Sequence, residues 1–382
     1  MLRRLYTINF FDAFIAGVTA VVVPLLMASR GISVESIGLV FALSPVVKPV
    51  VRVFAAASAD SFGEKANYAL GAAGNFAQAI AYALASTPFG FAVGKTCDAA
   101  RESLIWSVNR PSVMAIAPHR GHFALAGLLS GRFIYNALGS LSVGMLFAAG
   151  GFGLLFSAVA AIAALMLLLS LGVKNTHVHG TRIRLSDLSP FGRGRLFYET
   201  SGALFTGGSL YIVVIYMLLP LYFSSLGFSL GEIGALYAAY FLINGSALNV
   251  LSHRSVRSSK VAYAGAAIFV VTLLGMGLSG KDAVPVFFLA MAFGDACLGL
   301  LWEELNWRAV KDSRKKATDL AVMNLPSYAG IAAASALSGF AVAWAGYFPL
   351  LALCAASEVA FAAWCLRLAG LKAREGQAGV QN

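Results

Sequence analysis

The sequence predicts an all-α polytopic membrane protein with twelve transmembrane helices in two six-helix bundles. Three observations predict this fold: the composition, the long apolar runs and an internal duplication. Of the 382 residues, 59% are hydrophobic and 12% are charged, and the mean hydropathy is +0.78. Because a soluble domain carries about 45 to 50% apolar and about 25% charged residues, the composition excludes a soluble, disordered or nucleic-acid-binding chain.

Twelve apolar runs are long enough to cross a bilayer, whose hydrocarbon core of about 30 Å needs roughly 20 helical residues. The 39 glycines and 11 prolines are spread among these runs, where membrane helices tolerate them. The first run continues past Pro24, beyond the length of a signal-peptide core, so we expect it to be retained. The predicted spans are 5–27, 37–57, 67–85, 89–115, 123–148 and 153–173 in the first half, and 196–223, 233–251, 261–278, 284–307, 320–344 and 348–368 in the second.

The distribution of basic residues predicts the orientation. Most of the 28 Lys and Arg residues lie in predicted loops or tails on the side shared by both termini, and only Arg30 and Lys281 lie on the other side. Since cytoplasmic loops are enriched in Lys and Arg, both termini are predicted to be cytoplasmic. We therefore expect an integral multi-pass protein of a prokaryotic cytoplasmic membrane.

The two halves of the sequence match each other at an offset of 196 residues. The run PLLMASRGISVESIGLVFA from Pro24 aligns with PLYFSSLGFSLGEIGALYA from Pro220, and Trp106 aligns with Trp302. Matches in one register predict two homologous bundles inserted in the same orientation and related by a pseudo-twofold axis along the membrane normal. The predicted divisions are an N-terminal bundle at 1–173, a cytoplasmic linker at 174–195, a C-terminal bundle at 196–369 and a cytoplasmic tail at 370–382.

The duplication and the loop after the second predicted span resemble the major facilitator superfamily (MFS), and the resemblance covers nearly the whole chain. The loop AASADSFGEK is similar to the family motif G-x-x-x-D-R/K-x-G-R/K-R/K, which it fits at Asp60, Gly63 and Lys65 and from which it departs at three positions. The resemblance implies that these three residues form a conformational latch at the cytoplasmic end of the spans. It also implies a transporter in which spans one, four, seven and ten line a central cavity.

The fourth predicted span carries the densest set of charges: Lys95, Asp98, Arg101 and Glu102. Helical spacing places Lys95, Asp98 and Glu102 on one face together with Trp106. A charge at the centre of a bilayer costs about 2.5 to 3.5 kcal/mol on insertion scales, so this face is expected to look into the bundle or a wet cavity. Two interpretations stay open: local pairing of Asp98 with Arg101 or Lys95, or a role in a transport pathway.

The other spans of the first half add Asp12, Lys48, Arg52 and Arg132. Asp12 and Arg52 lie at similar depths and could pair, whereas no acid of the first two spans lies level with Lys48 or Arg132. The excess of cations predicts an anionic group on the substrate, held by Arg forks and Lys point charges. The predicted substrate-binding residues are Lys48, Lys95, Arg101, Arg132, Tyr135, Asn136 and Trp302.

The spans of the second half contain no Lys or Arg but place Asp295 and Glu358 near mid-depth. An unpaired carboxylate in a low-dielectric site binds a proton more readily than one in water, so Asp295 is predicted to load and release a proton. Glu358 receives no role, because the resemblance implies a peripheral position for the last span. The predicted proton-coupling residues are Asp12, Asp98, Glu102 and Asp295.

These features predict a secondary active transporter that moves a small organic solute, anionic or zwitterionic, by alternating access and proton-coupled symport. The alternative is a proton-coupled exporter, an antiporter of drugs, lipophilic cations or lipids that uses Asp12 or Asp295. No enzyme activity and no cofactor are expected, since no P-loop, G-x-S-x-G or H-E-x-x-H motif occurs and the four cysteines lack metal-site spacing. The expected partners are a small-molecule substrate, protons and the bilayer, with a monomeric chain and no nucleic acid.

Overall fold

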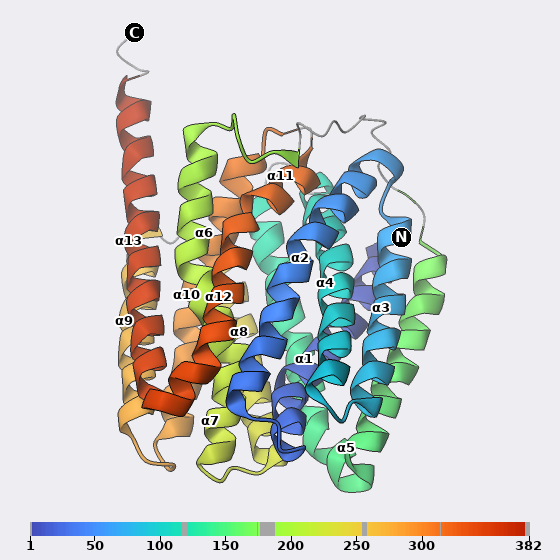
Figure 1. Cartoon of the computed structure of the whole chain (residues 1–382). Coiled ribbons are helices and arrows are strands. Elements are labelled where there is room, and N and C mark those ends of the chain that lie inside the picture. The colour runs from blue at the N-terminus through green and yellow to red at the C-terminus, as the bar shows by residue number, and fades with distance from the viewer. Residues whose placement is uncertain are drawn as a thin grey trace.

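The computed structural model describes residues 2–116, 121–173, 175, 188–253, 258–313 and 315–378, which form a bundle of helices without a strand (Figure 1). The helices of the first half are α1 (Leu2–Ser29), α2 (Val34–Phe62), α3 (Lys65–Leu84), α4 (Pro88–Ile116) and α5 (Gly121–Leu171). The second half contains α6 (Arg195–Val213), a π-helical segment (Val214–Leu218), α7 (Leu219–Ser225), α8 (Leu230–His253), α9 (Ser258–Leu278), α10 (Val284–Val310), α11 (Lys316–Met323), α12 (Leu325–Ala345) and α13 (Phe348–Ala378).

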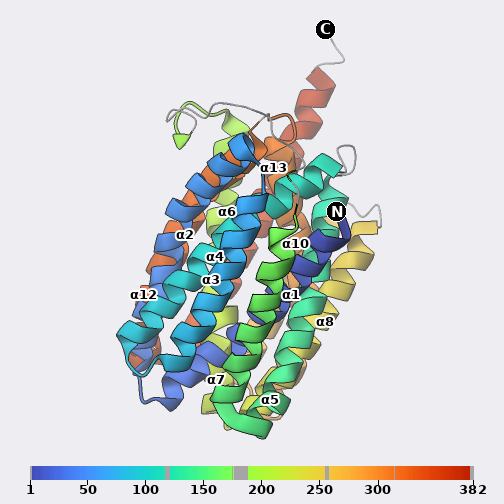
Figure 2. The ribbon, with the colours of Figure 1, turned by 90° about the vertical axis from the view of Figure 1, so that its right-hand side faces the viewer.

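The helices follow the predicted spans in order, and the differences have local causes. The 51 residues of α5 cover two predicted spans, and the helix reverses at Gly151, whose φ of 62° side-chain-bearing residues rarely adopt (Figure 2). The predicted span 320–344 is divided into α11 and α12 at Asn324, two residues before Pro326. The predicted span 196–223 is continuous but contains the π-helical segment.

Among the described residues, nine helices are long and apolar enough to cross a membrane. Neither α3 nor α4 is one of them, because buried polar side chains such as Asn75, Gln78, Asp98 and Arg101 lower their hydropathy. These two helices turn their polar residues toward the protein interior, as a helix in lipid must. The chain is an all-α integral multi-pass membrane protein, and the division into twelve crossings stays a prediction.

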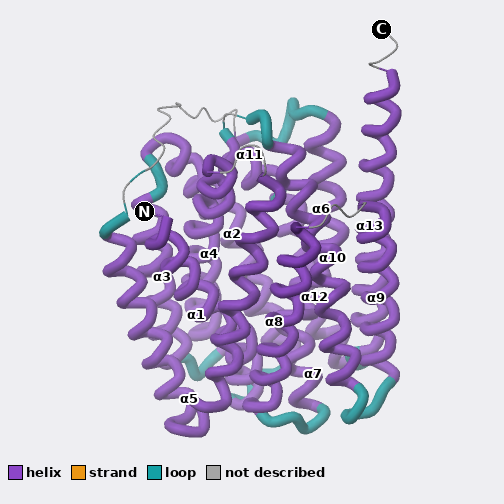
Figure 3. Tube along the Cα trace, turned by 180° about the vertical axis from the view of Figure 1, so that it is seen from behind, coloured by secondary structure: helices purple, strands orange, loops and turns teal. Residues whose placement is uncertain are grey.

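The loops of the bundle gather at two ends (Figure 3). We name them the α11 end, where α11 and the ends of α2, α4 and α10 lie, and the α7 end, where α7 ends and α2, α4 and α10 begin. The start of α1 and the end of α13 are both directed toward the α11 end (Figure 1). Most of the predicted linker and residues 379–382 of the predicted tail lie outside the described residues, and α13 continues nine residues past the predicted bundle boundary at 369 to Ala378.

Two loops at the α7 end repeat each other in detail. Gly31 and Gly227, which match in the sequence duplication, have φ values of 72° and 81°. In both loops the backbone amide of the residue after the glycine donates a hydrogen bond to the carbonyl oxygen five residues earlier. The N–O distances are 3.2 Å in the first loop and 3.1 Å in the second. The hydroxyls of Ser33 and Ser229 each accept a hydrogen bond from the backbone amide three residues later, and this bond caps the following helix. The offset of 196 residues thus relates hydrogen bonds as well as residue types.

Small residues let the two halves approach closely at the α7 end. A Cβ atom on Gly339 of α12 would lie 2.4 Å from the carbonyl oxygen of Val34 in α2, and one on Gly38 would lie 2.7 Å from a backbone oxygen of α12. Between α5 and α8, a Cβ atom on Gly144 would lie 2.9 Å from the Cα of Gly231. Close approach of this kind is the usual use of glycine in membrane helix packing.

Candidate functional site

A cavity of about 330 Å³ lies between the first half of the chain, α1 to α5, and the second half, α6 to α13. Residues of α1, α2, α4 and α5 form one wall, and residues of α6, α9, α10, α12 and α13 form the other. Trp106 and Trp302, the tryptophans that match in the duplication, both line it. Small-molecule sites range from about 300 to 1,000 Å³, so the cavity has room for a small solute.

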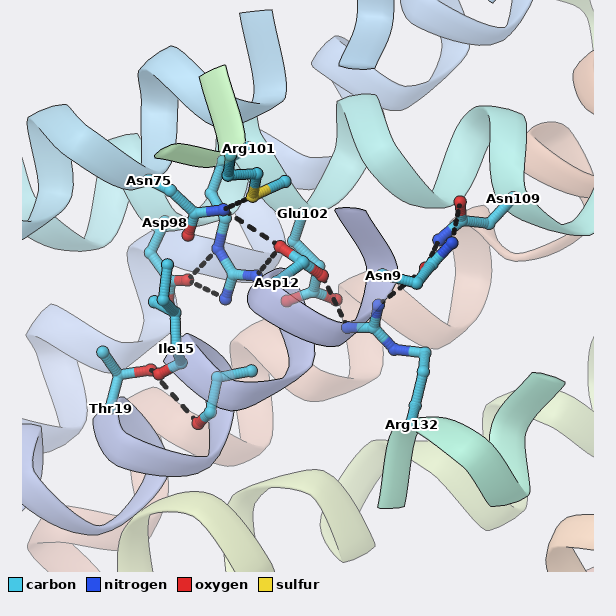
Figure 4. Close-up of polar contacts among 12 residues, drawn as sticks. Asn9, Asp12, Ile15, Thr19, Asn75, Asp98, Arg101, Glu102, Asn109 and Arg132 are labelled. Carbon is cyan, nitrogen blue, oxygen red and sulfur yellow. Dashed lines mark hydrogen bonds and ion pairs between the residues drawn. The ribbon is translucent and has the colours of Figure 1, made fainter. Parts of the chain in front are cut away.

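Asp12 forms ion pairs with two arginines of the first half, Arg101 and Arg132 (Figure 4). Its carboxylate lies 2.8 Å from Arg101 Nη1 and 2.7 Å from Arg132 Nη2, and it accepts a hydrogen bond of 3.1 Å from the amide of Asn75. The residue is 0% exposed and does not line the cavity. One carboxylate of α1 therefore ties α3, α4 and α5 together behind the cavity wall.

Asp98 forms the local pairs that the spacing allowed. Arg101 Nε and Nη2 both donate to Asp98 Oδ1, at 2.9 and 2.6 Å, and Lys95 Nζ lies 3.4 Å from Oδ2. Lys95 also lies over the ring of Phe41, 4.0 Å from its centroid. These groups line the cavity as a network whose charges largely cancel.

The remaining predicted cations of the cavity are also paired. Lys48 Nζ lies 2.8 Å from Glu102, and Arg132 pairs with Asp12 of α1. The expectation that no acid of the first two spans lies level with Arg132 is therefore wrong, and for Lys48 the partner comes from α4. Sequence depth alone missed the pair of Arg132 with Asp12 because the helices tilt and the arginine side chain is long.

Arg52 is a buried cation whose partner in the structure differs from the one that its depth in the sequence suggests. It could pair with Asp12 by depth, but Asp12 is held by Arg101 and Arg132, and Arg52 instead donates to the hydroxyl of Tyr328 in α12. The residue is 8% exposed and lines the cavity, and its Nε has no hydrogen-bond partner among the described residues. Within the described part of the chain, no carboxylate forms an ion pair with it. Its spacing of four residues from Lys48, on one helical face, was the signal that could have placed it in the cavity.

Asp295 lines the opposite wall and has only neutral partners. Its Oδ2 accepts hydrogen bonds from the hydroxyls of Tyr211 at 2.6 Å and Tyr240 at 2.7 Å, and from the amide of Asn244. The residue is 7% exposed, and no Lys or Arg in the described ranges pairs with it. The three donors come from α6 and α8, so the carboxylate connects three elements of the second half.

Glu358 contradicts the peripheral position that the resemblance implied. It lies in α13, is 3% exposed and lines the same cavity as Asp295. No described residue forms a hydrogen bond with its Oε1. The family pattern offered no signal for this placement, because it assigns the lining to other spans.

The other predicted binding residues divide into two groups. Asn136 and Trp302 line the cavity, and Asn136 Oδ1 is buried without a partner. Tyr135 does not line it: the ring packs edge-on against Phe10, with 4.7 Å between centroids. The reason is helical geometry, since adjacent residues of a helix point about 100° apart.

Contacts between the halves close the α11 end of the cavity. Arg110 of α4 makes a two-pronged ion pair with Glu303 of α10, with Nε 3.1 Å from Oε2. Its guanidinium also lies over Trp106, 4.6 Å from the ring centroid. Together with the bond between Arg52 and Tyr328, these contacts join the first half to the second on that side.

The predicted latch is described in part. Gly63 ends α2 with a φ of 90°, and the space beside it is filled by Asn175. Asn175 also accepts the backbone amide of Lys65 at 2.9 Å, and the Lys65 side chain is exposed. The side chain of Asp60 lies outside the described residues, so the latch role stays a prediction.

The fold and the cavity define a class of protein: a multi-pass helical membrane protein with a charged chamber between two halves of its chain. The chain belongs to the Major Facilitator Superfamily, whose family model matches residues 5–303. A search among curated proteins found no match.

Solved structures of transporters share the fold. The Escherichia coli fucose:proton symporter FucP aligns with a TM-score of 0.67 and 16% identity, over 95% of this chain and 98% of that chain. The human organic anion transporter MFSD10 aligns with a TM-score of 0.69 and 13% identity, over 95% and 99%. The nucleoside transporter NupG aligns with a TM-score of 0.69 and 13% identity, over 95% and 98%. At these identities the similarity concerns the fold alone.

Proposed function

We propose that the protein is a secondary active transporter that carries a small organic anion or zwitterion by alternating access, in symport with protons. It works as a monomer in a prokaryotic cytoplasmic membrane, with the α11 end and both termini in the cytoplasm. One observation carries the proposal: among the described residues, Arg52 on one wall of the cavity has no carboxylate partner, and Asp295 on the other wall has no cation partner.

Arg52 is the proposed anchor for the anionic group. A guanidinium has five N–H donors, and here one of them is used by Tyr328 while Nε has no partner. A carboxylate, phosphate or sulfonate can accept two parallel hydrogen bonds from this fork. Lys48 and Arg101 are held by acids in this conformation, so they are proposed to act on the solute through their pairs with Glu102 and Asp98.

Asp295 is the proposed proton site of the transport cycle. Its Oδ2 accepts all three described hydrogen bonds, which leaves Oδ1 on a residue that lines the cavity. Burying an ionised carboxylate without a cation is costly, and a bound proton removes that charge while the three donors keep their places. Because the donors lie on α6 and α8, a movement of these helices changes the surroundings of the carboxylate. Coupling requires such a difference between the two states.

The contacts between the halves support alternating access. The pair of Arg110 with Glu303 closes the α11 end, and the glycine contacts of α2 with α12 and of α5 with α8 close the α7 end. Rigid halves that rock about the cavity open one set of contacts while the other stays closed.

Proteoliposomes with a pH-sensitive dye inside test the proposal. The probes are panels of small carboxylates, sulfonates, phosphorylated compounds and amino acids, added outside without a pH gradient. Symport predicts that at least one probe acidifies the lumen, and that D295N abolishes the acidification while keeping exchange of labelled solute across the membrane. If no anion or zwitterion moves protons in the wild-type protein, the proposal fails.

The exporter alternative has its own supporting observation. Asp295 and Glu358 share the second-half wall with the aromatic rings of Trp302 and Phe361, and carboxylates combined with aromatic faces attract organic cations. An antiporter predicts that an inward proton gradient drives extrusion of lipophilic cations and that D295N stops it. Extrusion that is unchanged in D295N removes this alternative.

A further inference from the structure

Glu358 is a buried acid that the proposed cycle does not use. It is the eleventh of the 31 residues of α13, is 3% exposed, and lines the cavity. Its Oε1 is shielded from solvent and has no hydrogen-bond partner in the part of the chain that the structure describes. The described residues provide no hydrogen bond or ion pair to either carboxylate oxygen, so an ionised Glu358 would lack a described donor or cation, which is a costly arrangement.

The elements packed against α13 offer no cation to Glu358 in the described ranges. Those elements are α6, α9, α10, α12 and the π-helical segment. Arg308 of α10 pairs with Glu304, and Arg195 of α6 pairs with Glu199, as does Arg367 of α13 itself. Lys260, near the start of α9, is exposed and does not line the cavity. The other described charged groups are acids: Asp295 faces the same cavity and acts on Glu358 electrostatically, and Glu303 is paired with Arg110.

Neutral titratable groups do not compensate the charge either. The hydroxyl of Tyr211 on α6 is used by Asp295, Tyr216 of the π-helical segment lines the cavity, and Cys354 lies one helical turn away on α13 itself. Among the described residues, α9 brings Phe269 to the lining, and α12 brings Ser327, Tyr328, Ile331 and Ser335. The one titratable group of this set is Tyr328, whose hydroxyl accepts a hydrogen bond from Arg52. A like-charged neighbour and an apolar surrounding both favour the uncharged acid.

We propose that Glu358 carries a proton in this conformation and is a second proton-binding carboxyl of the transport cavity, beside Asp295. The two acids differ in their surroundings. Asp295 accepts three hydrogen bonds, which stabilise it as an anion once its proton leaves, whereas Glu358 accepts none that the structure describes. Glu358 therefore releases its proton only when the cavity opens to water or when a cation enters. Its part in transport rests on the proposed function, but its protonation does not.

Infrared spectroscopy of the full chain in liposomes tests the protonation directly. The carbonyl stretch of a protonated carboxylic acid is separate from the bands of a carboxylate, and it shifts in D2O. At pH 7 the difference spectrum of wild type minus E358Q is expected to contain this band. D295N is the matched control, and its spectrum should keep the Glu358 band. A wild-type minus E358Q spectrum without a protonated-acid band overturns the proposal.

A measurement on the wild-type protein covers the case in which E358Q does not fold. Dicyclohexylcarbodiimide takes the proton of a carboxylic acid on one nitrogen while the carboxylate oxygen adds to its central carbon, so it labels protonated acids in apolar sites. We expect peptide mass spectrometry to find the adduct on Glu358 at pH 7 and to find less of it as the pH rises. Labelling of other acids with Glu358 unmodified contradicts the proposal.

The role in transport has a separate readout. If the proposed symport holds, the E358Q protein should carry one proton fewer per solute, measured from the reversal potential of solute flux in proteoliposomes. A protein that binds the proton in the infrared test but transports no solute would refute the proposed function and leave the protonation of Glu358 standing. An unchanged reversal potential would remove Glu358 from the coupling.

Discussion

At the scale of single residues, the first half of the cavity is held by ion pairs with shared acids. Asp12 pairs with Arg101 and Arg132, and Asp98 pairs with Arg101 and Lys95, so these three cations have acid partners before any solute binds. Breaking a buried pair by removing one member typically costs about 3 to 5 kcal/mol, because the remaining charge is left uncompensated. These pairs are a requirement of the fold as much as of function.

Replacing Asp12 tests this structural role. We expect D12N to lower the free energy of unfolding by about 3 to 5 kcal/mol, because Arg132 loses its only described carboxylate. Unfolding in mixed micelles measures it. The exposed loop residue Asp282 provides the control, since surface changes such as D282N stay within about 0.5 kcal/mol. The double variant D12N/R132Q should be more stable than the sum of the two losses; strict additivity would contradict the pairing.

Replacing Arg52 tests the proposed anion anchor. Once a transported solute is identified, R52Q should raise its half-saturating concentration on the order of ten- to a hundredfold, because a hydrogen bond to a charged group is worth about 1.5 to 3 kcal/mol. Y328F removes the hydroxyl partner of Arg52 but keeps the cation, and it should have a smaller effect. Equal effects of the two variants on the half-saturating concentration would speak against direct binding of the solute by Arg52.

The sequence identified most of the charged residues that line the cavity, because a charged side chain in an apolar span is costly to expose to lipid and therefore faces the protein interior. It did not identify their partners. Pairing depends on helix tilt and on the reach of long side chains, so helix depth alone predicts neither the pair of Arg132 with Asp12 nor the bond of Arg52 to Tyr328. The sequence did not predict that Glu358 lines the cavity, because no periodic pattern places the last helix against the cavity.

At the scale of elements, apolar runs predicted the order of the helices well, and the differences lie where a single residue changes the backbone. The reversal at Gly151 follows from a positive φ, and the break between α11 and α12 lies at Asn324, just before Pro326. The π-helical segment Val214–Leu218 has no comparable signal, because its residues, VIYML, also suit an α-helix.

The contact between α2 and α12 gives a prediction at this scale. In G339V the added side chain meets backbone atoms of α2 that cannot move aside, so the α7 end should no longer close. Spin labels on cysteines at the exposed positions Ser33 and Ala345, with the native cysteines replaced, should then report a longer distance. G127A is the control, since a Cβ there meets no atom within 4 Å. An unchanged distance in G339V would show that this contact does not limit closure.

At the scale of the whole molecule, the two halves meet at both ends of the cavity in this conformation. Arg110 with Glu303 and Arg52 with Tyr328 join them at the α11 end, and backbone contacts through glycine join them at the α7 end. The first set consists of polar side chains that can separate and be hydrated, and the second consists of close backbone packing. The chain belongs to the Major Facilitator Superfamily and shares the fold of FucP, MFSD10 and NupG, and we propose that the cavity serves transport.

The central claim is that the cavity opens to each side of the membrane in turn, and it can be tested without knowing the solute. Ser44 lines the cavity and can carry a single cysteine in a chain whose four native cysteines are replaced. A membrane-impermeant maleimide, applied to one side of sealed, oriented vesicles at a time, should label S44C from either side. Exposed control positions should react from one side each, S33C from the α7 end and F191C from the α11 end. If S44C reacts from one side only, or from neither, while both controls react, the account of alternating access is wrong.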